Sequence, residues 1–270
     1  MKPAGGMLWG LLLLLLAAQV RAVEQLAVEV METLPHDVNA FTQGLEWHDG
    51  RLYESTGLYG QSGLRQLKAY NGEAERHLPL SATLFGEGLA RVDNQLVQLT
   101  WKEGRALVWR LPGLKMETGF TYQGEGWGLC YDGRQLWMSD GSAHLQQRSK
   151  TDFVLQQRLT VRLHGQPQHR LNALACVGEH IYANVWKETY ILRIQKDSGR
   201  VDAVIDASSL LPLSGRKRHP EAVLNGIAYR PDTGEFYLTG KWWSRLFKVR
   251  FVQVSGTDAA GEATAALKAR

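Results

Sequence analysis

The chain has 270 residues, with 31 Lys and Arg against 27 Asp and Glu, which gives a formal charge of +4 at pH 7. Its basic residues are scattered, whereas nucleic-acid binding needs a basic stripe along one face, so the composition argues against a nucleic-acid partner. The one basic cluster, from Arg216 to His219, is expected to be a solvated loop. Nine Trp and 28 Gly with only eight Pro favour many short strands joined by tight turns.

The first segment, residues 1–22, is expected to be a secretory signal peptide. Lys2 precedes an apolar run over residues 7–18, and small side chains just before Val23 suit cleavage there. A membrane anchor is the alternative, but the run is shorter than the roughly 20 apolar residues that cross a bilayer. We therefore expect an exported protein, periplasmic or secreted, without stable membrane insertion after cleavage.

A short unit recurs five times after this segment: a polar or aromatic residue, a small residue, an apolar strand, a turn and a second strand. The small residues at positions 44, 88, 128, 173 and 226 are 44, 40, 45 and 53 residues apart. Such a period matches the roughly 40–50 residues of a four-stranded propeller blade. Turn signals such as Asp49-Gly50 and Asp132-Gly133 favour a hairpin in each copy. The copies begin at Thr42-Gln43-Gly44-Leu45, Gly86-Glu87-Gly88-Leu89, Gly126-Trp127-Gly128-Leu129, Leu171-Asn172-Ala173-Leu174 and Leu224-Asn225-Gly226-Ile227.

Further strands are expected after each hairpin. The expected third strands are 64–69, 106–111, 144–148, 190–194 and 245–251, and the expected outer strands are 75–80, 114–122, 153–162 and 201–205. The last copy lacks an outer strand, and the spare strand Leu26–Met31 could supply it and close the ring. The sequence thus predicts an all-β, five-bladed β-propeller over residues 23–254, its last blade closed by the N-terminal strand, followed by a flexible C-terminal tail, 255–270. An open β-sandwich is the alternative.

The chain has two cysteines, Cys130 and Cys176, and export would permit a disulfide between them. Aligning the repeats puts the two on opposite strand faces. This placement favours two separate buried thiols, although the sequence does not decide between them and a bridge.

The residue before each small residue of the repeat is polar or aromatic, and ring closure would gather these five positions around one channel mouth. The second strands of the hairpins end near the same mouth, with Trp101, Trp186 and Lys241. Aromatic walls with a few polar groups are typical of a ligand site. The alternative is that the tryptophans only pack between blades, that Glu87 is paired with a lysine and that Lys241 is solvated. No His, Cys and carboxylate cluster stands at metal-ligand spacing, so the residues give no sign against a protein that works without a metal or other cofactor.

At these residues the chain resembles the glutamine cyclotransferase family, the plant and bacterial type of glutaminyl-peptide cyclotransferase, over nearly its whole mature length. The motifs in order are Phe41-Thr42-Gln43-Gly44-Leu45, Tyr53-Glu54-Ser55-Thr56-Gly57-Leu58-Tyr59-Gly60, Phe85-Gly86-Glu87-Gly88-Leu89, Leu99-Thr100-Trp101-Lys102, Ala183-Asn184-Val185-Trp186 and Thr239-Gly240-Lys241-Trp242-Trp243. The resemblance implies a five-bladed propeller that works without catalytic zinc. It also implies an active site of residues matching Gln43, Glu87, Trp101, Trp127, Asn172, Trp186 and Lys241. One departure is Asn172-Ala173-Leu174-Ala175, where the family usually has Asn-Glu-Leu-Glu; we expect activity to survive it.

The reaction implied is the conversion of the N-terminal glutamine of peptides to pyroglutamate, with release of ammonia. We expect Glu87 to move the protons and Lys241 to stabilise the oxyanion as catalytic residues, and Gln43, Trp101, Trp127, Asn172 and Trp186 to bind the substrate. The protein is expected to be a monomer whose partners are peptides or proteins that begin with Gln.

Two other functions fit the same predicted fold. A non-catalytic exported propeller could bind a peptide or sugar through the aromatic mouth. A hydrolase or lyase acting on sugars would want paired carboxylates, and Asp140, in a Ser-Asp-Gly turn sequence, is the second candidate beside Glu87.

Overall fold

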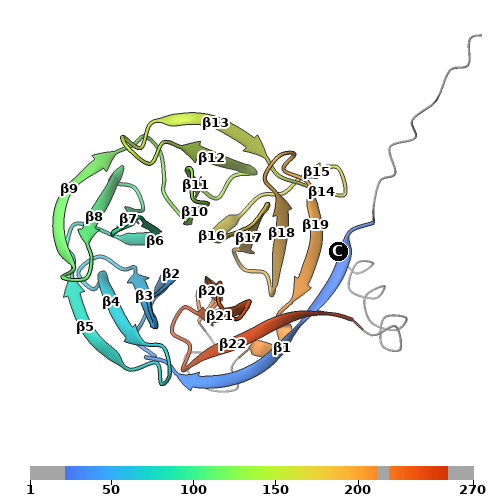
Figure 1. Cartoon of the computed structure of the whole chain (residues 1–270), viewed down its shortest axis with the longest axis horizontal. Helices are drawn as coiled ribbons and strands as arrows, with labels where there is room; N and C mark the ends of the chain where they lie inside the picture. The colour runs from blue at the N-terminus through green and yellow to red at the C-terminus, as the bar shows by residue number, and fades with distance from the viewer. Residues whose placement is uncertain (1–21, 212–218, 255–270) are drawn as a thin grey trace, which may run out of the picture.

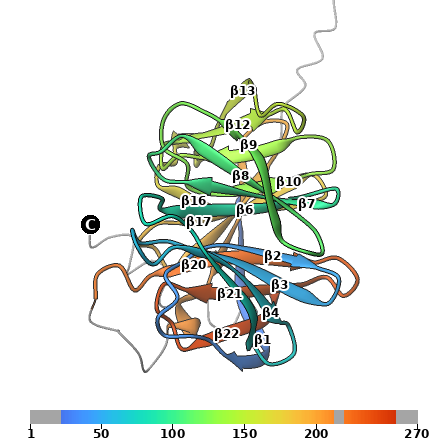
Figure 2. The same cartoon turned by 90° about the vertical axis from the view of Figure 1, so that its left-hand side faces the viewer.

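The computed structural model describes residues 22–211 and 219–254, and this part of the chain is a ring of short β-sheets (Figure 1). From the side, the sheets lie one above the next and not in two facing layers (Figure 2), so the fold is propeller-like and not a sandwich. Within the described residues no helix has the length and apolar character needed to cross a bilayer. The predicted signal peptide up to residue 21, the tail from residue 255 and the basic cluster up to Arg218 lie outside the described residues.

Three sheets have four antiparallel strands each, in chain order. The first contains β2 (Thr42–His48), β3 (Arg51–Thr56), β4 (Gly63–Lys68) and β5 (Ala74–Pro79); the second contains β6 (Gly86–Val92), β7 (Gln95–Thr100), β8 (Arg105–Arg110) and β9 (Lys115–Thr121); the third contains β10 (Leu129–Tyr131), β11 (Leu136–Ser139), β12 (His144–Arg148) and β13 (Leu155–Thr160). In each sheet the first two strands are one of the predicted hairpins.

The remaining strands form one eight-stranded sheet in the order β16-β17-β18-β19-β1-β22-β21-β20. Its strands are β1 (Glu24–Pro35), β16 (Leu171–Val177), β17 (His180–Val185), β18 (Tyr190–Gln195), β19 (Val201–Asp206), β20 (Leu224–Arg230), β21 (Glu235–Gly240) and β22 (Arg245–Gln253). A small hairpin of β14 (Arg162–Leu163) and β15 (Gln166–Pro167) and a single 3-10 turn, η1 (Ser208–Leu210), were not predicted.

The N-terminal strand β1 completes the last unit of the ring, as predicted. It pairs antiparallel with β22, with Val28 opposite Phe251. Its opposite edge pairs in parallel with β19, with Leu26 opposite Ile205, and the sequence did not predict this second pairing. Figure 1 shows β1 running beside both strands. Because β1 is shared, the two ends of the described chain are tied together and no edge is left open there.

The core lies between neighbouring sheets. Leu64 of β4 and Leu96 of β7 belong to one apolar cluster, and Trp137 of β11 and Ile181 of β17 belong to another. Each sheet therefore packs one face on the preceding sheet and the other face on the next. This packing aligns the innermost strands of the ring around a common channel.

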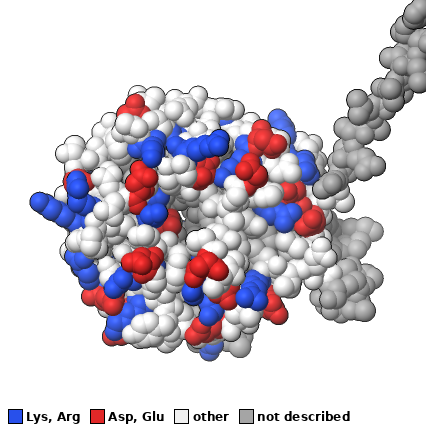
Figure 3. All heavy atoms as spheres, viewed as in Figure 1, with Lys and Arg blue, Asp and Glu red and all other residues white. Residues whose placement is uncertain are grey.

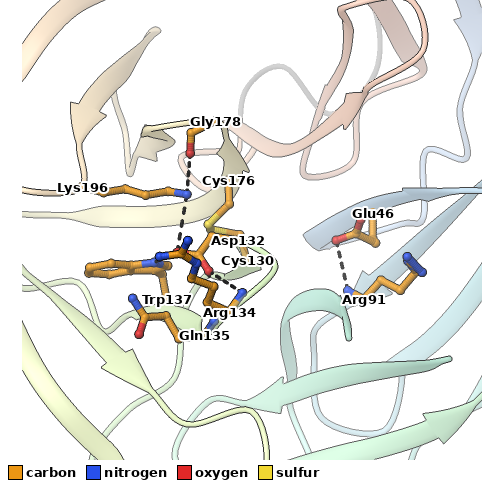
Figure 4. Close-up of a disulfide and its surroundings, with 10 residues drawn as sticks. All are labelled: Glu46, Arg91, Cys130, Asp132, Arg134, Gln135, Trp137, Cys176, Gly178 and Lys196. Atoms are coloured by element: carbon orange, nitrogen blue, oxygen red, sulfur yellow. Dashed lines mark hydrogen bonds and ion pairs between the residues drawn. A yellow bond between two sulfur atoms is a disulfide. The ribbon is translucent and has the colours of Figure 1, made fainter. Parts of the chain in front are cut away.

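The expectation of two separate thiols was wrong, because Cys130 of β10 and Cys176 of β16 form a disulfide with their Cα atoms 5.5 Å apart (Figure 4). The repeat alignment had placed the two side chains on opposite faces of equivalent strands. Neighbouring sheets of a ring meet through opposite faces, so opposite faces are what a bridge between them requires. The bond joins the innermost strands of two adjacent sheets.

The charged groups of the face drawn in Figure 3 are of both signs and interspersed. That face shows no stripe of basic residues. The absence of a nucleic-acid partner stays a prediction.

Candidate active site

The polar residues of the repeat lie at bulges near the start of the innermost strands. The pairing with the second strand shifts register between Thr42 and Gly44, Gly86 and Leu89, Leu171 and Leu174, and Leu224 and Ile227. Such bulges redirect a side chain and are frequent beside functional sites. They turn Gln43, Glu87 and Asn172 into one pocket.

The small residues of the repeat allow these strands to approach each other closely. A Cβ atom on Gly88 would lie 2.5 Å from the Leu129 backbone nitrogen, and one on Gly128 would lie 2.0 Å from the Asn172 carbonyl oxygen. Only glycine fits at such distances. At these positions the small residues therefore serve close packing of the backbones around the axis.

The ends of the second strands are fixed by one recurring backbone hydrogen bond. In four of the five hairpins, the residue after the second strand donates its N–H to the carbonyl of the residue two places before the inner polar position. The bonds are Gly57 to Phe41 (2.8 Å), Trp101 to Phe85 (2.9 Å), Trp186 to Arg170 (2.8 Å) and Lys241 to Val223 (3.0 Å). This bond places Trp101, Trp186 and Lys241 at the same mouth as Glu87.

All seven predicted site residues line this pocket, which has a volume of about 340 Å³. Trp127 and Trp186 meet edge to face, with their ring centroids 5.8 Å apart. The pocket has four further lining residues that the site prediction omitted: Phe41, Leu58, Phe85 and Glu221. Phe41 and Phe85 each stand two residues before an inner polar residue, so the repeat held a signal for them. It held none for Leu58 or Glu221.

A chain of hydrogen bonds runs behind the pocket. Asn225 Nδ2 donates to Gln43 Oε1 at 3.0 Å, and Gln43 Nε2 donates to Glu87 Oε1 at 2.9 Å. Asn225 holds the inner polar position of the last copy, but the site prediction did not include it. Asn172 Oδ1 is buried without a hydrogen-bond partner among the described residues, so it can accept from a bound N–H group.

Two buried ionisable groups face this pocket. Glu87 and Lys241 are each only 4% exposed. Burial raises the pKa of Glu87 well above its usual range, and the charge of Lys241 opposes that shift. Burial lowers the pKa of Lys241, with Glu87 opposing. An acid and an amine shifted toward neutrality in one cleft are typical of groups that exchange protons with a ligand.

Asp140, the second carboxylate expected for the sugar-cleaving alternative, does not lie in the pocket. Asp140 accepts from the Ser142 backbone N–H at 3.0 Å and from Gln146 Nε2 at 2.9 Å. It therefore stabilises its own turn, and Asp140 does not line the pocket. In residues 22–211 and 219–254, no three His, Cys, Asp or Glu side chains are grouped so as to hold a metal ion.

The two alanines that depart from the family pattern are buried. Ala173 and Ala175 belong to an apolar cluster that also holds Leu224 and Ile227 of β20. They pack between the two halves of the eight-stranded sheet, while Asn172 beside them still reaches the pocket. A larger hollow of about 600 Å³ at the other ends of the innermost strands, lined by Glu46 and Cys176 among others, contains none of the predicted site residues.

A propeller-like ring with a buried acid and a buried amine in an indole-walled pocket defines a protein with a ligand site at one channel mouth. The chain belongs to the glutamine cyclotransferase family, whose model matches residues 8–251. A glutaminyl-peptide cyclotransferase of Arabidopsis thaliana is 34% identical over 233 residues, which are 84% of this chain and 72% of that protein. The crystal structure of Myxococcus xanthus glutaminyl cyclase is 39% identical and superposes with a TM-score of 0.81, covering 87% of this chain and all of that one. The family predicted from the motifs is thereby confirmed.

Proposed function

We propose that this chain is a glutaminyl-peptide cyclotransferase, which converts the N-terminal glutamine of peptides and proteins to pyroglutamate and releases ammonia. Membership of the family and the names of the two relatives support this activity. The observation that carries it is the presence of Glu87 and Lys241, both buried, in one pocket walled by indoles.

Ring closure needs the neutral α-amine to attack the side-chain carboxamide carbon of the same glutamine. A C–N bond forms, the old C–N bond breaks, and one proton passes from the amine to the departing ammonia. Glu87 takes that proton as a base and returns it as an acid. Its raised pKa suits this double role, because proton transfer is most effective when the pKa lies near the working pH.

Lys241 stabilises the negative charge that attack places on the carboxamide oxygen. Trp101, Trp127 and Trp186 hold the aliphatic part of glutamine folded, so that the amine and the carbonyl carbon meet. Gln43 orients Glu87 through its hydrogen bond, and Asn172 accepts from an N–H group of the substrate through its unpaired oxygen. Every step is performed by protein side chains, and we propose no catalytic metal or other cofactor.

We further propose that the ring counts as a five-bladed propeller. The three four-stranded sheets are three blades, and the eight-stranded sheet is two blades joined through β1. The catalytic domain is residues 23–254, residues 1–22 are a cleaved signal peptide, and 255–270 are a tail. The protein acts outside the cytoplasm as a monomer. The intact mass of protein recovered from the expressing cell and its light-scattering mass in solution test cleavage and oligomeric state.

The activity is tested by incubating purified protein with a Gln-initiated peptide in the presence of a chelator. Mass spectrometry should show loss of one ammonia, whereas a peptide that begins with Asn should stay unchanged. Binding of the Gln peptide without loss of ammonia would favour the non-catalytic alternative. Activity that the chelator abolishes would contradict the metal-free mechanism.

A further inference from the structure

Two carboxylates at the rim of the pocket hold its three indole walls. Trp101 and Trp127 both donate their indole N–H to Glu125 Oε2, at 2.8 and 3.0 Å. Trp186 donates its indole N–H to Glu221 Oε2 at 3.0 Å. Each carboxylate lies ahead of an innermost strand, whereas Trp101 and Trp186 follow the second strand of the preceding repeat unit. These contacts therefore connect neighbouring units across the mouth.

The two carboxylates are themselves fixed by lysines in the same way. Lys102 Nζ lies 3.8 Å from Glu125 Oε1 and 3.8 Å from the ring centroid of Trp101. Lys187 Nζ lies 3.2 Å from Glu221 Oε1 and 4.3 Å from the ring centroid of Trp186. One oxygen of each carboxylate thus faces an indole and the other faces a lysine. This arrangement occurs twice, in units far apart in the sequence, which indicates a role beyond a chance surface ion pair.

We propose that Glu125 and Glu221 are positioning residues, which fix the orientation of Trp101, Trp127 and Trp186 before substrate enters. The proposal rests on the function proposed above. The three rings shape the pocket, and a ring released from its acceptor can rotate about its side-chain bonds. Glutamine cyclises only when its amine and carboxamide are held in contact, so loosened walls cost both binding and rate.

Glu125 has a second effect, which an experiment must separate from the first. Lys241, Glu125 and Glu103 are the charged groups that act on Glu87, and the negative charge of Glu125 helps to keep the pKa of Glu87 high. Glutamine at position 125 would keep an oxygen that can accept both indole bonds, because both end on the same atom, but it would carry no charge. Alanine removes the acceptor and the charge together.

We therefore compare Glu125→Gln with Glu125→Ala, and Glu221→Gln with Glu221→Ala, in the full chain. Glu125→Ala should lower kcat/KM for a Gln peptide by roughly 10–100-fold, with a raised KM, as expected when a positioning group is lost. The kcat/KM of Glu125→Gln should stay within about threefold of the wild-type value. The acidic limb of its pH profile should move to lower pH, because the pKa of Glu87 falls when the charge at position 125 is lost. Glu221→Ala should lose less kcat/KM than Glu125→Ala, since it frees only one indole. Glu221→Gln should regain the wild-type value, because its amide oxygen can accept the same indole bond.

The matched control is Asp132→Ala, because Asp132 Oδ2 also accepts an indole N–H, from Trp137 at 2.8 Å, outside the pocket. This variant should leave KM unchanged. Near-ultraviolet circular dichroism of the free proteins reports fixed tryptophan packing without any catalysis. This dichroism signal should weaken in Glu125→Ala and Glu221→Ala and should match that of wild type in Glu125→Gln and Glu221→Gln.

Glu125→Ala with the KM and the spectrum of wild type would overturn the proposal. Equal loss in Glu125→Gln and Glu125→Ala would also overturn it, because charge and not position would then be the cause. If wild type forms no pyroglutamate at all, the proposed reaction fails, but the spectra still decide whether the carboxylates hold the indoles.

Discussion

Gln43 donates its side-chain N–H to Glu87 Oε1 over 2.9 Å, and both residues come from bulges at the start of innermost strands. The bond links two adjacent sheets at the pocket. It engages one oxygen of the Glu87 carboxylate, which itself lines the pocket.

This bond makes Glu87→Gln a clean test of proton transfer. The amide oxygen of the new side chain can accept the same bond from Gln43, while the amide cannot act as a base. We expect kcat to fall by roughly 10²–10⁴, the usual worth of a general acid or base, with an unchanged melting temperature. Steady-state kinetics and thermal unfolding check this, and near-wild-type turnover would falsify the assigned role.

Lys241→Ala removes the proposed oxyanion donor. Because its contact with the carboxamide oxygen strengthens only as charge develops, kcat should fall by roughly 10²–10³ and KM should change less. Lys248→Ala is the control, since the Lys248 ammonium pairs with Glu32 at 2.7 Å, away from the pocket. Initial rates over a range of peptide concentrations distinguish the two effects. A raised KM at unchanged kcat would mean that Lys241 only binds substrate.

The stability of the folded ring of sheets should depend on pH through His36 and Glu54, whose buried side chains lie 2.8 Å apart in an ion pair. Burial alone would raise the pKa of Glu54, but the charge and hydrogen bond of His36 and the charge of Arg65 outweigh it and lower that pKa to about 2. Burial alone would lower the pKa of His36, but the charge and hydrogen bond of Glu54 outweigh it and raise that pKa.

The direction of each pH effect follows from the linkage between proton binding and folding. The contribution of Glu54, on the order of 3 kcal/mol, is full above its unfolded pKa of 4.5 and is lost as the pH falls toward 2. The contribution of His36 is full below 6.5 and is lost as the pH rises through its folded pKa. Unfolding free energy measured between pH 6 and 3 should fall less steeply in the double variant His36→Gln with Glu54→Gln than in wild type or in the surface control Glu75→Gln. Both residues are replaced because Glu54→Gln alone would leave His36 buried with a lowered pKa, which itself reduces stability as the pH falls. Equal slopes in all three proteins would show that Glu54 does not control acid stability.

Gly128→Ala should destabilise the fold, because the new Cβ atom would lie 2.0 Å from the Asn172 carbonyl oxygen. A backbone shift is needed to relieve that contact, and we expect a loss of about 2 kcal/mol or more. Gly113→Ala is the matched control, since nothing lies within 4 Å of a Cβ atom at that position. Denaturant unfolding of both variants checks this. Equal stability of the two would contradict the close packing of the innermost strands.

Replacing Cys130 and Cys176 together by alanine should lower stability and spare catalysis. The bridge closes a loop of 46 residues, which in the chain-entropy model stabilises by about 4 kcal/mol. It lines the hollow at the opposite ends of the innermost strands, so kcat should stay as in wild type. Thermal unfolding with and without reductant, together with a thiol titration, tests this. Free thiols in the untreated protein would contradict the bridge.

The sequence by itself determined the repeat and hence most of the fold. Its period, its turn residues and its alternating strands are local features, so the hairpins could be located within a few residues and His144–Arg148 was predicted with its observed bounds. The predicted pocket residues come together for the same reason, since equivalent positions of a repeat must meet once the ring closes. Asn225 and the two phenylalanines stood at such positions and could have been included.

Only the tertiary structure decided the contacts between units. The parallel pairing of β1 with β19, the disulfide and the shared acceptor Glu125 each depend on how one sheet faces the next. A repeat unit carries no local record of that relation, because its hydrophobic pattern says which side chains are buried and not which neighbour they meet. The two faces of a sheet look alike in sequence and become different only when another sheet packs on each of them.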